Sequence, residues 1–106
     1  MKRGEIWTVA GGKDYAGKPR PALILQDDRF DATESITMTT DPTEAPLFRV
    51  AIAPTERNGL NMLSRLMVDK ITTVPKNRLG HRLGHVDVKD MERVEQAVLI
   101  FLGVGA

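Results

Sequence analysis

The residue best suited to chemistry is an arginine between two prolines, in the segment Lys18-Pro19-Arg20-Pro21. Proline fixes its own φ angle and restricts the residue before it, so the backbone is stiff around Arg20. A guanidinium in a fixed place can hold a phosphate or a carboxylate through two parallel hydrogen bonds. Arg20 is therefore a candidate anion-binding residue, and an ion pair with an acidic residue of the same sheet explains it equally well.

Threonine hydroxyls form the second candidate, in the segment SITMTT. Because side chains alternate along a strand, Thr37 and Thr39 share the face opposite Ile36 and Met38. A pair of hydroxyls on one face could hold a phosphate. The high β-propensity of threonine is the simpler explanation, and we prefer it for these residues taken alone.

A carboxylate beside an ammonium group, Asp69-Lys70, is the third candidate. Alternation within the apolar run places Asp69 opposite Leu66 and Val68, hence outward. An outward aspartate beside a lysine is usually only a surface ion pair.

Metal and cofactor chemistry finds little support. The chain has no cysteine, which excludes disulfides, thiolate zinc sites and cysteine nucleophiles. His81 and His85 could share an ion on a helix, but Gly80 and Gly84 disfavour a helix there. We interpret this stretch as a solvated basic turn, and we predict no metal and no cofactor.

Short strands separated by turn residues must position these side chains. Gly59 is the natural site of a positive φ within a turn over residues 58–63. The segment 22–26, ALILQ, is nearly continuous in apolar residues and predicts a central strand buried on both faces. The predicted strands are 5–9, 22–26, 35–40, 48–52 and 66–74, and the predicted loops are 10–19 and 41–47.

Near the C-terminus, the spacing of the apolar residues changes from that of a strand to that of a helix. Asp87 is a plausible N-cap and Gly103 a plausible stop. The fold class is mainly β with a C-terminal helix packed on a small barrel or strongly curled sheet. The apolar stripe of the helix is Met91, Val94, Ala97, Val98, Phe101 and Leu102.

Length and charge limit the function classes. The 106 residues, 42% of them apolar, predict a single domain over residues 1–106. With 15 Lys and Arg against 14 Asp and Glu, the chain cannot coat nucleic acid through bulk charge, so a local basic groove is needed. No signal peptide and no apolar run of about 20 residues is present, so we expect a cytoplasmic protein with no membrane contact.

Several segments, taken in order, resemble the MazF/PemK family of toxin endoribonucleases. They cover nearly the whole chain, and their combination is more specific than any one of them. The resemblance implies an SH3-like barrel of the CcdB/MazF type, a homodimer, and metal-independent, sequence-specific cleavage of single-stranded RNA, often mRNA. The segments are RGEIWTV, DYAGKPRPALILQDD, ITMTTD, NGLNMLSRLMVDKITTV, PKNRLG and a helix closing in LG.

Matching positions imply roles for individual residues. Arg20 matches the family's catalytic arginine, an acid or a stabiliser of the phosphorane. Thr39 matches the residue that holds the reacting phosphate, and Thr40 would replace it if the register shifted by one. Further residues are implied as RNA-binding, and Asp69 among them serves some members as a base. They are Asp14, Tyr15, Lys18, Ser64, Asp69 and Lys70.

Two departures from the family pattern bear on the mechanism. Many members carry a glutamate in the first loop, where this chain has Asp14 as its nearest acidic residue. Members that pair the aspartate with an arginine two residues earlier have no counterpart here, because that position is Met67. An Arg20 and Thr39 mechanism is therefore favoured.

The resemblance also implies partners. A 2′-hydroxyl nucleophile limits the substrate to RNA and excludes DNA. A cognate antitoxin with an acidic, disordered tail is expected to lie in the RNA groove. Two alternatives are a CcdB-type gyrase-inhibiting toxin and a catalytically silent SH3-like binding module.

Overall fold

The computed structural model describes residues 1–10, 20–40, 49–67 and 71–104. In this part of the chain, seven strands and two short 3-10 helices precede one α-helix. The elements are β1 (Glu5–Val9), β2 (Arg20–Ile24), η2 (Asp28–Phe30), β3 (Ser35–Thr40), β4 (Arg49–Ile52), β5 (Ser64–Met67), β6 (Thr72–Pro75), η3 (Lys76–Arg78), β7 (Leu79–His85) and α1 (Val88–Leu102).

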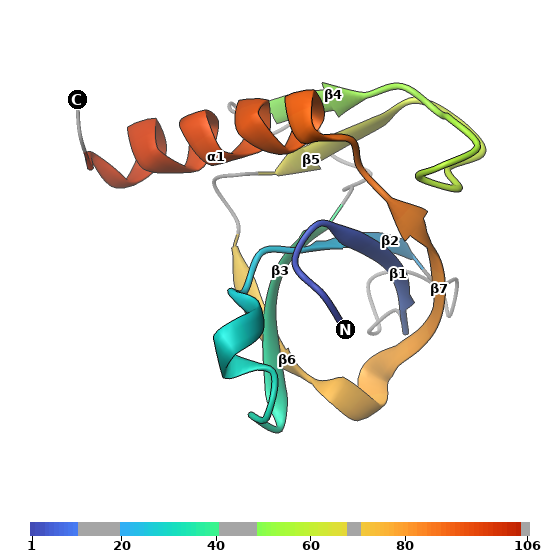
Figure 1. Ribbon diagram of the computed structural model, residues 1–106, viewed down its shortest axis with the longest axis vertical. Coiled ribbons are helices and arrows are strands. Elements are labelled where there is room, and N and C mark those ends of the chain that lie inside the picture. Colours follow the sequence, from blue (N-terminus) through green and yellow to red (C-terminus); the bar gives the residue numbers. More distant parts are fainter. Residues whose placement is uncertain (11–19, 41–48, 68–70, 105–106) are drawn as a thin grey trace.

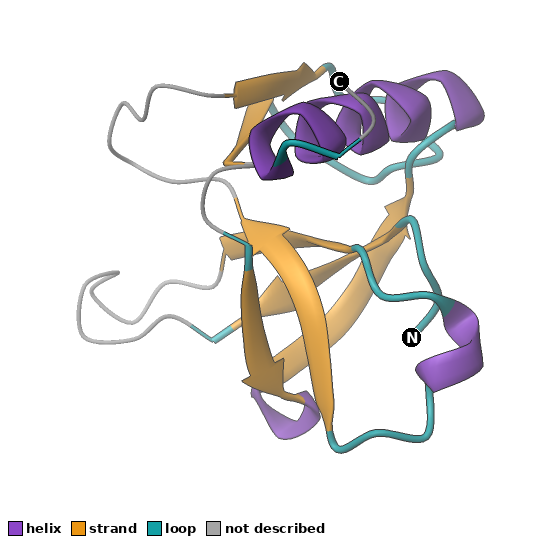
Figure 2. Cartoon of the chain, turned by 90° about the vertical axis from the view of Figure 1, so that its left-hand side faces the viewer, coloured by secondary structure: helices purple, strands orange, loops and turns teal. Residues whose placement is uncertain are grey.

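Five strands form one curled antiparallel sheet, in the order β6-β3-β2-β1-β7, and β4 pairs with β5 in a second small sheet. Figure 1 shows the large sheet winding round, with β4, β5 and α1 lying together across one end of it. Figure 2 shows the same two layers from the side. The mainly β fold with a C-terminal helix is confirmed. The sheet does not close into a barrel, because the edge strands β6 and β7 do not pair and the η3 turn lies between them.

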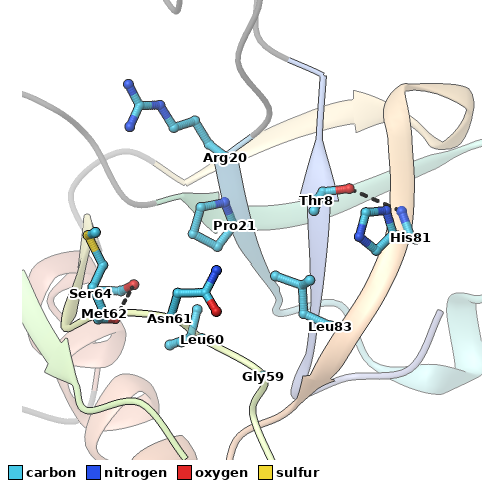
Figure 3. A pocket seen from close by; sticks show the side chains of 10 residues that line it. All are labelled: Thr8, Arg20, Pro21, Gly59, Leu60, Asn61, Met62, Ser64, His81 and Leu83. Carbon is cyan, nitrogen blue, oxygen red and sulfur yellow. Dashed lines mark hydrogen bonds between the residues drawn. The ribbon is translucent and has the colours of Figure 1, made fainter.

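The small sheet is attached to the large one by close backbone packing between the β4–β5 connection and β7. The amide of His85 donates to the carbonyl oxygen of Arg57 at 2.9 Å. A Cβ on Gly84 would overlap that oxygen and lie 2.6 Å from the carbonyl carbon of Asn58. Gly59 has the expected positive φ of 70°, and a Cβ on it would overlap the carbonyl oxygen of Leu83 (Figure 3). Neither Gly59 on the β4–β5 connection nor Gly84 on β7 can therefore carry a side chain at this junction.

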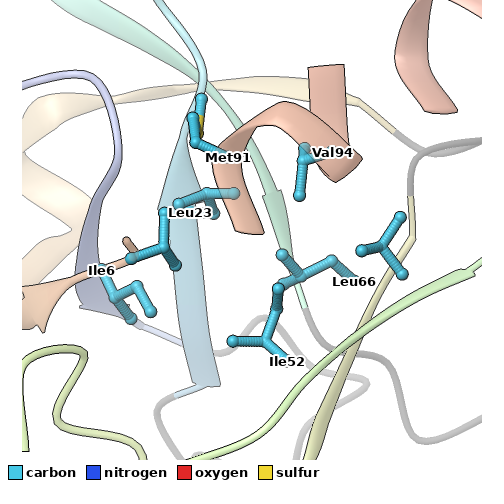
Figure 4. Close-up of a cluster of buried hydrophobic side chains, with 8 residues drawn as sticks. Ile6, Leu23, Ile52, Leu66, Met91 and Val94 are labelled. Atoms are coloured by element: carbon cyan, nitrogen blue, oxygen red, sulfur yellow. The ribbon is translucent and has the colours of Figure 1, made fainter. Parts of the chain in front are cut away.

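Strand β2 lies at the centre of the large sheet and is buried on both faces, as predicted, but it spans Arg20–Ile24 rather than residues 22–26. Leu23 points into a core formed with α1 and the small sheet, and Figure 4 shows Ile6, Ile52 and Met91 in the same cluster. Ala22 on the opposite face packs inside the curl of the large sheet. The second cluster comprises Val9, Ala22, Ile24, Ile36, Met38, Val74 and Leu79.

Two predicted elements are wrong. A single strand over 66–74 is not formed, because β5 and β6 belong to different sheets. The predicted basic turn around His81 is instead strand β7, paired with β1. Its glycine at position 80 allows close approach to β1: a Cβ there would overlap the Oγ1 atom of Thr8, which accepts a hydrogen bond from the amide of His81 at 3.0 Å.

Helix α1 begins and ends where the sequence predicts. The Asp87 side chain accepts a hydrogen bond from the amide of Asp90 at 2.8 Å, and Gly103 ends the helix with a φ of 74°. The first half packs on the core as expected, with Met91 and Val94 buried. The predicted burial of the last turn is wrong in this single chain, because Leu102 is 59% exposed. No helix in the described residues is long and apolar enough to cross a membrane.

A polar network joins β1 to β7 at the far edge of the large sheet. Glu5 accepts hydrogen bonds from the indole of Trp7 at 3.1 Å and from the Nε of Arg82 at 2.6 Å. Burial would raise the pKa of Glu5, but the amide of Lys2, the Trp7 indole and the Arg82 guanidinium together hold that pKa below its ordinary value. Glu5 therefore stays ionised and links the two strands.

The junction between β7 and the β4–β5 connection should be intolerant of a methyl group. We expect Gly84→Ala to lower the free energy of unfolding by about 3 kcal/mol or more, because the new Cβ meets backbone atoms that cannot move independently. Gly103→Ala is the matched control, with no atom within 4 Å of its new Cβ. It should cost only about 1 kcal/mol, the penalty of a left-handed φ. Urea unfolding measures both, and equal losses would contradict the packing described.

Candidate active site

An open pocket of about 360 Å³ lies where the start of β2 meets β7 and the β4–β5 connection (Figure 3). Segments far apart in the sequence therefore supply its walls: β1, β2, the β4–β5 connection with the start of β5, and β7. The lining residues are Thr8, Arg20, Pro21, Gly59, Leu60, Asn61, Met62, Ser64, His81 and Leu83.

Two residues predicted for the site, Arg20 and Ser64, lie together in this pocket. Arg20 begins β2 opposite Val9 of β1 and is half-buried, so its position follows from the pairing of two strands. Ser64 begins β5 and is 2% exposed. Its hydroxyl donates to the carbonyl oxygen of Met62 at 3.4 Å, which is a long contact and leaves the oxygen available as an acceptor. The site combines a permanent cation with a neutral hydroxyl.

Thr39 does not line this pocket. It is fully buried and lies opposite Leu23 in the pairing of β3 with β2. Residues directly opposite share a face and neighbours alternate, so Thr39 is on the face of Leu23, while Arg20 is on the face of Ala22. Thr40 is the backbone partner of Ala22. Arg20 and Thr39 therefore lie at the same end of the β2–β3 pair but on different faces.

The other predicted threonine has a structural partner. The Oγ1 atoms of Thr37 and Thr73 lie 3.1 Å apart across the β3–β6 pair, in direct register. Such a cross-strand hydroxyl pair stabilises a sheet edge. This supports the structural interpretation of Thr37.

Five predicted RNA-binding residues lie outside the described residues, and their roles stay predictions. They are Asp14, Tyr15, Lys18, Asp69 and Lys70.

Sequence reasoning missed three polar residues of the pocket. Thr8 was assigned only to a strand, Asn61 only to a turn, and His81 to a solvated basic segment. His81 and His85 cannot share a metal ion, since four residues of a strand span about 13 Å. Within the described ranges, no group of three or more His, Asp or Glu side chains is placed to hold a metal.

Asn58 gives the pocket's loop its shape. Its Oδ1 atom accepts hydrogen bonds from the amides of Thr55 and Leu60, each at 3.0 Å, and its Nδ2 donates to Ala53 at 2.9 Å. The Thr55 hydroxyl oxygen in turn accepts from the Asn58 amide at 3.0 Å. With 1% of its surface exposed, Asn58 is a buried polar group whose side chain makes three hydrogen bonds to the backbone. The loop that follows is therefore held in one conformation.

Comparisons with known proteins identify the family of this chain. The family model described as "PemK-like, MazF-like toxin of type II toxin-antitoxin system" matches residues 2–102. A "Probable endoribonuclease MazF" of Mycolicibacterium smegmatis is 53% identical over 98% of both chains. The "Endoribonuclease EndoA" of Bacillus subtilis is 28% identical over 98% of this chain and 96% of its own. Among solved structures, an endoribonuclease in complex with its cognate antitoxin, from a mycobacterial species, superposes with a TM-score of 0.81 at 22% identity, covering 100% of this chain and 96% of that one.

The fold and the match over residues 2–102 define the class, a small β toxin with a C-terminal helix. The chain belongs to the PemK-like, MazF-like toxins of type II toxin–antitoxin systems.

Removing the Asn58 side chain should loosen the pocket. We expect Asn58→Ala to lower the free energy of unfolding by about 2–3 kcal/mol, because buried amide and carbonyl groups lose their partner. Asn77→Ala, an exposed asparagine of η3, is the matched control and should change stability by less than about 0.5 kcal/mol. Thermal unfolding of both variants tests this. An Asn58→Ala variant as stable as the control would mean that the hydrogen bonds do not hold the loop.

Proposed function

We propose that this protein is the toxin of a type II toxin–antitoxin pair and acts as an endoribonuclease on single-stranded RNA. The observation that carries the proposal is the placement of Arg20, the match to the family's catalytic arginine, at the rim of a pocket whose walls come from segments far apart in the sequence. The names of the relatives, "Probable endoribonuclease MazF" and "Endoribonuclease EndoA", support the same activity.

The proposed reaction is an internal transfer of the phosphoryl group. The ribose 2′-oxygen forms a bond to the adjacent phosphorus, and the bond from phosphorus to the 5′-oxygen of the next nucleotide breaks. One proton leaves the 2′-hydroxyl, to Asp69 or to solvent, and Arg20 or a solvent water donates one to the departing 5′-oxygen. The products are a 2′,3′-cyclic phosphate and a 5′-hydroxyl, and no cofactor is required.

Arg20 is proposed to stabilise the charge that develops on the phosphoryl oxygens, because a planar guanidinium meets two of them at once. Strand pairing with β1 fixes its backbone before the substrate arrives, which lowers the cost of reorganisation. Thr39 remains the second proposed catalytic residue. It is fully buried in the single chain and lies on the opposite face of the sheet from Arg20. Its hydroxyl would therefore contribute from that face and not from the pocket.

Substrate binding is proposed to use a local groove rather than the net charge of +1. Ser64 is in the described pocket, and Asp14, Tyr15, Lys18, Asp69 and Lys70 are proposed to extend the surface. A 2′-hydroxyl nucleophile makes DNA inert as a substrate.

A homodimer and an antitoxin are the proposed partners. Apolar side chains at the end of α1 are exposed, including Ile100 at 62% and Leu102 at 59%, and a symmetric interface would cover such a surface. A structural neighbour is an endoribonuclease solved with its cognate antitoxin. The proposed site of action is the cytoplasm, where RNA is available. The family match favours this function over gyrase inhibition or a silent binding module.

The test is cleavage of a long single-stranded RNA by the purified protein in EDTA. We expect discrete cuts with 5′-hydroxyl ends. Arg20→Ala should lower kcat/KM by about 100- to 1,000-fold, the usual cost of losing a charge-stabilising group. Arg29→Ala, which removes a 79% exposed arginine of η2, is the matched control and should cleave like the wild type. Intact RNA with a folded wild-type protein would refute the proposed function.

A further inference from the structure

We propose that the pocket beside Arg20 is a nucleobase subsite, in which Asn61 and His81 contact the base of a nucleotide next to the phosphate held by Arg20. This inference rests on the proposed function and adds to it the residues that read the substrate.

The walls of the pocket suit the flat faces of a base. Pro21, Leu60 and Leu83 supply apolar surface, and the volume of about 360 Å³ lies at the lower end of the range for small-ligand sites. Such a volume accommodates a single base. Stacking against apolar and aromatic side chains is the common way in which proteins hold unpaired RNA bases.

Two polar side chains lie on opposite walls of the pocket (Figure 3). Asn61 comes from the β4–β5 connection, is exposed, and has an amide group to which no described residue hydrogen-bonds. A carboxamide offers one acceptor and two donor hydrogens, which match the edge of a base. His81 comes from β7 and presents an exposed ring that can stack on a base or hydrogen-bond to it.

Both residues stand on a rigid backbone. The amide of His81 is fixed by the Oγ1 of Thr8, and the loop that carries Asn61 is fixed by Asn58 and by the packing of Gly59 on Leu83. A subsite prepared in this way loses little conformational entropy when the base enters.

A base fits this lining better than an acidic antitoxin segment does. Among the lining residues that the structure describes, Arg20 is the one Lys or Arg side chain, and the other residues are polar and uncharged or apolar, apart from the imidazole of His81. An acidic peptide would be favoured by several cations in a row. A single cation can bind one phosphate, and the apolar slot beside it, with its carboxamide, can bind one base.

The experiment uses the wild-type cleavage site mapped on a long RNA. A short RNA containing that site is made with an abasic nucleotide at each flanking position in turn. We expect the abasic substitution at one position to lower wild-type kcat/KM by about 10- to 100-fold, the usual range for a lost stacking contact.

Asn61→Ala and His81→Ala should each lower kcat/KM on the intact RNA by about 10-fold. In these variants, the same abasic substitution should lower kcat/KM by less than about 3-fold, because the side-chain substitution and the missing base remove the same interaction. The matched controls, Asn77→Ala and His85→Ala, change the same residue types at exposed positions outside the pocket lining and should keep the full wild-type penalty.

The outcomes separate the two claims. No cleavage by the folded wild-type protein would refute the endoribonuclease itself. Cleavage with the full abasic penalty retained at every position in Asn61→Ala and His81→Ala would overturn the base subsite and leave the endoribonuclease standing. The same result accompanied by weaker antitoxin binding in both variants would assign the pocket to the protein partner instead.

Discussion

The structure depends on one steric constraint, the contact of the backbone after β4 with the backbone of β7. The turn that contains Arg57 and Gly59 packs directly on residues 83–85, with no side chain between the two backbones. This contact fixes the small sheet relative to the large one, so the core between them forms in one arrangement. It also brings the loop of residues 59–62 to the side of Arg20, which creates the pocket. The same backbone contact therefore determines both the arrangement of the two sheets and the position of the pocket.

The arrangement explains how a small chain without cysteine could carry out the proposed phosphoryl transfer. Such chemistry needs position and positive charge more than it needs a reactive nucleophile of the protein, because the RNA carries its own 2′-hydroxyl. Arg20 is placed by strand pairing, and the opposite wall is placed by Asn58 and the glycine contacts. With a net charge of +1, the overall field contributes little, so binding relies on groups gathered at this point.

Much of the fold follows from local patterns, while the junction does not. Strand-forming residues located β1 and alternation located β3 to the residue, and the caps located α1, because these signals lie within a few neighbouring positions. Strand β7 was missed because Gly80 and Gly84 lower strand propensity. These glycines are needed for close approach to Thr8 and Arg57, which are distant in the sequence. For the same reason Asn61 and His81 escaped notice: a loop and a strand about 20 residues apart form one pocket only after folding. Arg20 was identified because its prolines are adjacent in the sequence.

The most direct test of the central claim concerns the nucleophile. A short RNA containing the mapped cleavage site is made with a single 2′-deoxynucleotide immediately 5′ of the bond that is cut, and cleavage is measured in EDTA. Internal attack by the 2′-hydroxyl predicts that this bond is no longer cut, while a deoxynucleotide at a neighbouring position leaves cleavage intact. Cleavage of the deoxy-substituted bond at the rate of the unmodified RNA would contradict the account.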